Sequence, residues 1–341
     1  MSTEGLRKLD ALWARGTDFL GTKYAILGGA MSWVSERHLV SAISNAGGFG
    51  VLACGSMDAA LLSAEIAATR ALTDKPFGVN LITMHPDLDS LIQVCADHKV
   101  SHVVLAGGVP SGQSIKVIKE FAKIMCFAPT AVFGKKLVRS GADALIIEGS
   151  EAGGHIGPVA TSVLAQEILP IIRDVPVFVA GGIAKGQAIA SYLEMGASGC
   201  QLGTRFVVAD ESIAHENFKK AFVRANARDA LSTAQVDPKF PVIPVRALKN
   251  AGTEDFMATQ RDMVAKFHAG EMTQEEAQMG IEKFWVGALR RAVVDGDVEN
   301  GSLMAGQSVG MVKSKSSTQD IIDELVSDAV AFMDRGDRLT A

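Results

Sequence analysis

One histidine occupies a setting suited to proton transfer. His155 follows Gly153 and Gly154 within Glu148–Gly157, directly after the apolar run Ala144–Glu148. Imidazole titrates near neutrality and can take or give a proton at working pH. The glycine pair lets a flat ligand lie close to the backbone. We therefore interpret His155 as a catalytic base or acid, with a hydrogen-bonded structural histidine as the alternative.

Two turns rich in small residues are suited to binding a phosphate group. Ala180-Gly181-Gly182-Ile183 ends one apolar run, and Gly203-Thr204 ends the next. Glycine lets backbone N–H groups approach an anion, and a following helix start adds the positive end of its dipole. Thr204 adds a hydroxyl donor. Ordinary tight turns are the alternative, but two such turns at neighbouring strand ends favour a phosphate site.

These residues need a scaffold in which several strand ends meet. Eight short apolar runs alternate with helical patterns: Tyr24–Gly29, Phe49–Ala53, Phe77–Ile82, His102–Ala106, Lys123–Phe127, Ala144–Glu148, Val175–Ala180 and Gly199–Gly203. Most are continuously apolar, which indicates parallel strands buried on both faces. The pattern predicts an α/β fold, a closed (β/α)8 TIM barrel, with a doubly wound open sheet as the alternative. In such a barrel, sites lie at the C-terminal strand ends, and phosphate often binds after the seventh and eighth strands.

The pattern changes after the eighth unit. Asp229–Pro244 contains three prolines and reads as irregular, whereas Thr253–His268 and Thr273–Val293 predict amphipathic helices, the second with a capping box. Trp285 and Phe284 are interpreted as part of the core of this helical part, with an interface as the alternative. Ser317–Arg335 predicts a final helix after a Gly/Ser-rich loop. We divide the chain into a barrel with an N-terminal extension (1–228), a helical lid subdomain (229–300), and a loop with a C-terminal helix that returns to the barrel (301–341).

Composition excludes several classes of protein. Apolar residues make up 48% and charged residues 21%, as in a globular chain with a core. The net charge of −5, the 6% aromatic content and the lack of a basic stripe argue against nucleic acid as a partner. No apolar run is long enough to cross a membrane, and the first residues do not resemble a signal peptide. The four separated cysteines predict no disulfide framework, so we expect a cytoplasmic protein.

A metal site is not expected. His98 and His102 have the four-residue spacing of a metal pair, but they fall at a predicted helix end and a strand start. Because a single helix does not span both, they share no face. The chain also has no H-E-x-x-H motif.

The motifs together resemble the nitronate monooxygenase family, formerly called 2-nitropropane dioxygenases, which includes the FMN-dependent enoyl-acyl-carrier-protein reductase II. The resemblance extends from about Lys23 to about Lys313. Its motifs are Gly29-Ala30-Met31, Ala46-Gly47-Gly48, Lys75-Pro76-Phe77-Gly78-Val79-Asn80, Glu151-Ala152-Gly153-Gly154-His155, Ala180-Gly181-Gly182-Ile183, Gly203-Thr204-Arg205-Phe206 and Met304-Ala305-Gly306-Gln307. It implies FMN on a TIM barrel with a helical lid.

The resemblance also implies residue roles. Gly181, Gly182, Gly203 and Thr204 would hold the FMN phosphate, Met31 and Asn80 would contact the isoalloxazine ring, and His155 would be the catalytic acid or base. The implied cofactor-binding set further includes Gly29, Ala30, Glu148, Gly154, Ala180 and Gln307. The chain departs from the family pattern in the first strand, where Gly28 replaces a glutamine and Ala30 a glycine. This departure concerns contacts near the edge of the flavin ring.

The leading functional hypothesis is a nitronate monooxygenase that oxidises alkyl nitronates with O2 to carbonyl compounds and nitrite. The alternative is an NAD(P)H-dependent reductase of enoyl thioesters carried on acyl carrier protein, and a homodimer is compatible with either. A flavin-binding module without turnover is disfavoured by His155. A flavin-free phosphate-binding barrel, such as a sugar-phosphate isomerase, is a further alternative.

Overall fold

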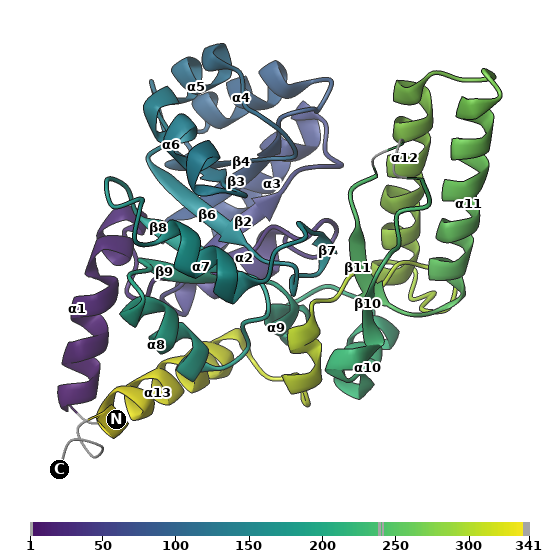
Figure 1. Cartoon of the computed structure of the whole chain (residues 1–341). Helices are drawn as coiled ribbons and strands as arrows, with labels where there is room; N and C mark the ends of the chain where they lie inside the picture. Colours follow the sequence, from purple (N-terminus) through teal and green to yellow (C-terminus); the bar gives the residue numbers. More distant parts are fainter. Residues whose placement is uncertain (1–2, 238–239, 241, 337–341) are drawn as a thin grey trace.

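The centre of the molecule is a closed barrel of parallel strands. The computed structural model describes residues 3–237, 240 and 242–336. Eight strands close in the order β1-β2-β3-β4-β5-β6-β8-β9 (Figure 1), which confirms the predicted (β/α)8 barrel. They are β1 (Ile26–Gly28), β2 (Phe49–Ala53), β3 (Phe77–Ile82), β4 (His102–Ala106), β5 (Lys123–Phe127), β6 (Ala144–Glu148), β8 (Val177–Ala180) and β9 (Gly199–Leu202).

Helices connect successive strands on the outside of the barrel. They are α2 (Arg37–Asn45), α3 (Ala59–Leu72), α4 (Leu88–Asp97), α5 (Gly112–Ile118), α6 (Ala131–Ser140), α7 (Thr161–Ile168), α8 (Gly186–Glu194) and the short α9 (Thr204–Val207). Local sequence explains several starts, since Asp58, Ser111 and Thr130 each accept a hydrogen bond from a backbone N–H in the first turn. His98 caps the end of α4 and His102 begins β4, as predicted.

An N-terminal helix closes the bottom of the barrel. This segment was expected only as an N-terminal extension of the barrel, but it forms α1 (Thr3–Leu20), which buries Leu9, Trp13 and Leu20. The Phe19 ring lies 5.2 Å from the His102 ring and 6.2 Å from the Phe178 ring. The helix therefore fills the end of the barrel opposite the strand C-termini.

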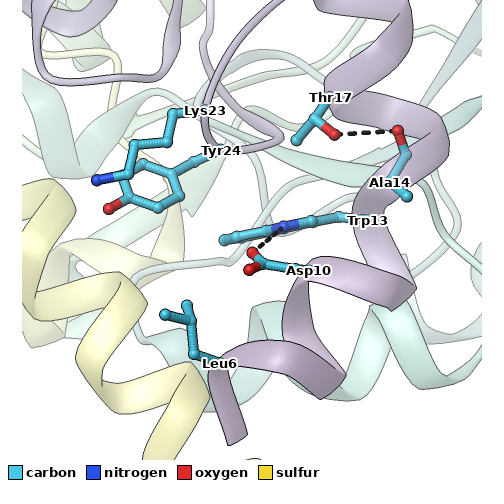
Figure 2. A pocket seen from close by; sticks show the side chains of 7 residues that line it. All are labelled: Leu6, Asp10, Trp13, Ala14, Thr17, Lys23 and Tyr24. Carbon is cyan, nitrogen blue, oxygen red and sulfur yellow. Dashed lines mark hydrogen bonds between the residues drawn. The ribbon is translucent and has the colours of Figure 1, made fainter. Parts of the chain in front are cut away.

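A cavity of about 360 Å³ lies beside α1 where the chain enters β1 (Figure 2). The Trp13 indole and the Tyr24 ring form two of its walls, with ring centroids 5.6 Å apart. Trp13 donates a hydrogen bond from Nε1 to Asp10, and the Lys23 ammonium lies 4.7 Å from the centre of the Tyr24 ring. This cavity is at the N-terminal end of β1, so it is distinct from the strand C-terminal ends.

The C-terminal part adds a small sheet and a pair of helices. The sheet β10-β11-β7 joins β10 (Ala230–Ser232), β11 (Val245–Leu248) and β7 (Gly154–His155), after α10 (Glu216–Arg224) and η1 (Ala227–Asp229). The expectation that Asp229–Pro244 is wholly irregular was therefore wrong. The strand escaped notice because it is three residues long and is held by pairing with distant residues.

The two lid helices have a hydrophobic core of their own. Helices α11 (Ala251–His268) and α12 (Gln274–Val293) run side by side, away from the barrel (Figure 1). Trp285 is 3% exposed, and its ring centroid lies 4.0 Å from that of Phe256. The predicted core role of Trp285 and the capping box at Thr273 and Glu276 are both confirmed.

The last elements return to the barrel. After η2 (Gln307–Met311), helix α13 (Thr318–Gly336) packs against α8, α1 and α2 (Figure 1). The four cysteines are buried thiols without disulfides. The described residues contain no helix long and apolar enough to cross a membrane, and no cluster of side chains suited to holding a metal ion.

Candidate active site at the barrel mouth

Strand register identifies the side chains that point into the barrel. Phe49, His102 and Phe178 contact one another or Phe19, so they face inward at the bottom. Paired residues on neighbouring strands share a face, and side chains alternate along a strand. Through the pairing of neighbouring strands, the same face reaches Asn80, Glu148, Ala180 and Gln201 at the C-terminal strand ends. We call this group the mouth layer.

The polar members of the mouth layer differ in their hydrogen bonding. Asn80 is buried and donates from Nδ2 to the Val104 carbonyl, 3.1 Å away, which fixes the side-chain amide. The Glu148 carboxyl forms no hydrogen bond with the described residues, and burial raises its pKa to about 7. This carboxyl therefore takes up a proton more readily than an exposed glutamate does.

Gln201 is a mouth-layer residue that sequence analysis missed. It lies on β9, two residues before Gly203, and is 8% exposed. A Cβ at Gly29 would lie 3.3 Å from the Gln201 Nε2 atom, so the amide lies against the exit of β1. The signal that could have found it was its position two residues before the Gly-Thr turn, on the inward face of a barrel strand.

The first glycine turn has the geometry of an anion site. Gly181 and Gly182 have φ values of +98° and +71°, which L-residues with side chains rarely adopt. Their backbone N–H groups donate to no protein acceptor within the described ranges. A Cβ at Gly181 would lie 2.8 Å from Thr161 Oγ1, and one at Gly182 would lie 3.0 Å from Glu151 Cβ. The turn therefore presents unpaired N–H donors at positions where a side chain would not fit.

The second turn brings distant loops together. The Thr204 hydroxyl oxygen accepts a hydrogen bond from the Gly306 backbone N–H at 2.9 Å and keeps its own proton to donate. The backbone N–H groups of Gly203 and Thr204 likewise have no acceptor in the described part of the chain. A Cβ at Gly203 would lie 3.4 Å from Met31 Sδ, so the predicted thioether contact lies beside this turn. Ala30 precedes Met31 at the partly exposed exit of β1.

The loop after β6 joins the two turns. Glu151 accepts hydrogen bonds from the Thr161 backbone N–H and hydroxyl, at 2.8 and 2.9 Å. Its backbone carbonyl accepts from the Gln307 N–H at 2.9 Å. Gly153 packs against the chain at Gly306, where a Cβ would lie 2.6 Å from the Gly306 nitrogen. Gln307 therefore belongs to the same rim as both glycine turns.

His155 lies where the barrel rim meets the lid. It is the second residue of β7, beyond Gly154 with its φ of +81°, and its side chain is exposed. β7 pairs with β11, which places His155 opposite Val245 and Gly154 opposite Arg246. Arg246 donates to the Ser150 carbonyl at 2.9 Å and to the Ala230 carbonyl at 2.6 Å. The sequence left open whether the cationic run Val245–Asn250 meets the barrel mouth or is only surface, and Arg246 of that run ties the histidine loop to the small sheet.

A second contact connects the lid with the barrel. Arg290 of α12 lies 5.9 Å from the centre of the Trp33 ring, in the loop after β1. Trp33 has a φ of +66°, an unusual value for a bulky residue, and its Nε1 has no hydrogen-bond partner among the described residues. The cavity beside it, of about 360 Å³, extends between the loops after β1 and β2. The contact between Arg290 and Trp33 therefore joins α12 to the loop after β1.

The fold and the rim define a TIM-barrel protein with two N–H-rich turns after β8 and β9. A model of the nitronate monooxygenase family matches residues 14–91 and 88–328, so the chain belongs to that family. The recognised family, with its enoyl-acyl-carrier-protein reductase II branch, is thereby confirmed. Enzymes of this family are flavin-dependent oxidoreductases.

Comparisons with individual proteins point in two directions. The chain is 31% identical, over 93% of its length and 96% of the relative's, to a Mycobacterium tuberculosis dehydrogenase of (3aS,4S,5R,7aS)-5-hydroxy-7a-methyl-1-oxo-octahydro-1H-indene-4-carboxyl-CoA. A probable nitronate monooxygenase of Staphylococcus saprophyticus is 26% identical, over 95% of this chain and 99% of the relative. Among solved structures, FabK from Thermotoga maritima is 36% identical with a TM-score of 0.84, covering 94% of this chain and 97% of FabK.

Proposed function

We propose that this protein is an FMN-dependent oxidoreductase of acyl thioesters. The observation that carries the proposal is the 31% identity to a dehydrogenase of a coenzyme A ester, which extends through 93% of the chain. The 36% identity to FabK supports it, because FabK belongs to the enoyl-acyl-carrier-protein reductase II branch. Both similarities exceed the 26% identity to the probable nitronate monooxygenase.

The residues of the rim suit FMN. A dianionic phosphate needs several hydrogen-bond donors, and the two turns supply them. The donors are the unpaired N–H groups of Gly181, Gly182, Gly203 and Thr204 and the Thr204 hydroxyl. Met31 offers an apolar contact beside Gly203. In the proposed complex, these turns hold the phosphate, while Asn80, Glu148 and Gln201 face the ring system with hydrogen-bonding groups. Gly29, Ala30, Gly154, Ala180 and Gln307 would line the remaining walls.

Bound FMN supplies the redox chemistry, because it can accept or release an electron pair. The protein then has to bind a thioester, orient its α,β carbon–carbon bond and manage one proton. We assign the proton to His155, whose imidazole would receive it from the α-carbon in oxidation and return it in reduction. NADH or NADPH would supply electrons in the reductive direction.

The charge of the mouth layer favours a neutral reacting group. Its polar members carry two amides and one carboxyl, and none of the four is a lysine or an arginine. An anionic nitronate over this layer would face the Glu148 carboxyl without a cation within the layer itself to balance it. A thioester is uncharged at its reacting carbons, so its reaction does not require such a cation.

Nitronate oxidation is the second candidate. The family model and the relative from Staphylococcus saprophyticus favour it. In this reaction the substrate would be an alkyl nitronate, O2 the oxidant, and His155 the base toward a neutral nitroalkane.

The test is a substrate comparison on FMN-loaded protein. Crotonyl-CoA with NADH or NADPH, and propionate 3-nitronate with O2, are assayed side by side. The proposal predicts turnover of the thioester. His155→Ala should lower that turnover about 100-fold, the range of general acid–base catalysis, while FMN content is unchanged. His98→Ala, at the end of α4, is the matched control. Turnover of the nitronate alone would contradict the thioester assignment.

A further inference from the structure

One carboxylate on the C-terminal helix binds a cation from each of the two phosphate turns. Glu324 of α13 accepts hydrogen bonds from Lys185 Nζ at 2.6 Å, on Oε1, and from an Arg205 guanidinium nitrogen at 2.7 Å, on Oε2. Lys185 follows Gly182 by three residues and is the N-cap of α8. Arg205 follows Thr204 directly. The residues that follow the two glycine turns are therefore joined, behind the rim, by ion pairs to a single carboxylate.

The packing around this pair of contacts is tight. A Cβ at Gly186, in the first turn of α8, would lie 1.9 Å from the Leu325 carbonyl oxygen, so α8 begins directly against the backbone of α13. The Arg205 side chain is only 7% exposed, whereas that of Glu324 is 39% exposed. Glu324 is the acidic partner of Arg205 among the described residues. Removing the carboxylate would leave a buried guanidinium without its counter-charge.

The Glu324 carboxyl is held in its charged form by the two cations that it binds. Burial by itself would raise the pKa of the carboxyl, but the hydrogen bonds from Lys185 and Arg205 outweigh burial and lower it. The carboxylate is therefore ionised at neutral pH. Its partners point away from the N–H groups that face the mouth, because their side chains extend to α13 on the outside of the barrel.

We propose that Glu324 is a positioning residue that fixes the distance between the two phosphate turns. The inference rests on the proposed binding of FMN by Gly181, Gly182, Gly203 and Thr204. A phosphate held by N–H groups from two separate turns is bound well only when both sets of donors are at hydrogen-bond distance together. A shift of one turn would weaken the contacts to the phosphate and leave those to the ring system largely intact.

The experiment compares two flavins that differ in the phosphate. Apoprotein of the full chain is titrated with FMN and with riboflavin by quenching of flavin fluorescence. Glu324→Gln should raise the Kd for FMN about tenfold while the Kd for riboflavin changes less than twofold. Glu324→Asp, which keeps the charge, should recover part of the affinity for FMN. The control is Glu216→Gln, which removes a similar ion pair, Glu216 with Lys315 at 2.8 Å, from α10.

The outcomes separate this inference from the proposed function. An equal loss of affinity for both flavins in Glu324→Gln, or no loss for FMN, would overturn the positioning role. Lys185→Met should reproduce part of the effect and provides a second variant. A wild-type protein that binds FMN no more tightly than riboflavin would instead contradict the proposed phosphate site itself.

Discussion

Replacing Gly181 with alanine tests the phosphate turn most sharply. Gly181 has a φ of +98°, and the left-handed region costs an L-residue roughly 1–2 kcal/mol. The new Cβ would also lie 2.8 Å from Thr161 Oγ1 and 3.0 Å from the Gly149 carbonyl oxygen. Such overpacking typically costs about 1–3 kcal/mol, so we expect a total of about 2–5 kcal/mol.

Gly196 provides the matched control. It has a φ of +104°, but a Cβ there would meet nothing within 4 Å. Gly196→Ala should therefore show the backbone strain alone, about 1–2 kcal/mol. Urea unfolding of both apoproteins measures the two costs, and their difference gives the cost of the contact at Gly181.

Binding of FMN distinguishes the two variants further. Gly181→Ala displaces a turn whose N–H groups are proposed to hold the phosphate, so its Kd for FMN should rise by about 10–100-fold, that is by about 1.4–2.7 kcal/mol. Gly196→Ala should bind FMN as the wild type does. If Gly181→Ala kept the wild-type Kd and lost no more stability than Gly196→Ala, the assignment of this turn would be refuted.

Three further predictions concern stability and reactivity. Burial lowers the pKa of His102 from 6.5 to about 4, so below pH 6.5 the unfolded chain binds a proton that the folded chain does not. The free energy of unfolding should fall by about 3 kcal/mol between pH 6.5 and 4. In His102→Asn, urea unfolding should show that this free energy depends less on pH. Trp285→Ala should cost the lid core about 3–5 kcal/mol, and limited proteolysis should then cut within 251–293 before the barrel. Burial raises the pKa of the Cys95 and Cys126 thiols to about 12, so neither should react with a disulfide reagent at pH 8 until urea unfolds the chain.

The barrel was predictable because its signals are local. Each strand is a short apolar run between turn residues, and both glycine turns follow such runs, so sequence position alone placed Gly181 and Gly203 at one rim. The capping box at Thr273 is similarly a four-residue signal. Such features depend on neighbours in sequence, which sequence analysis can read.

The missed features depend on residues far apart in the chain. β7 has only two residues and exists through pairing with β11, about ninety residues later. Gln201 could be recognised as a site residue only from the strand register, which places its amide beside Gly29. The N-terminal helix was different, since Leu9, Trp13 and Leu20 already have helical spacing. The charged residues between them made the segment look like a polar extension rather than an amphipathic helix.

An anaerobic absorbance spectrum of the FMN-loaded protein tests whether it transfers electrons between nucleotide and thioester. NADH or NADPH is added first, and crotonyl-CoA second. We expect the nucleotide to remove the visible flavin absorbance and the thioester to restore it. Protein that binds no flavin, or flavin absorbance that responds to propionate 3-nitronate but is not restored by the thioester, would contradict this expectation.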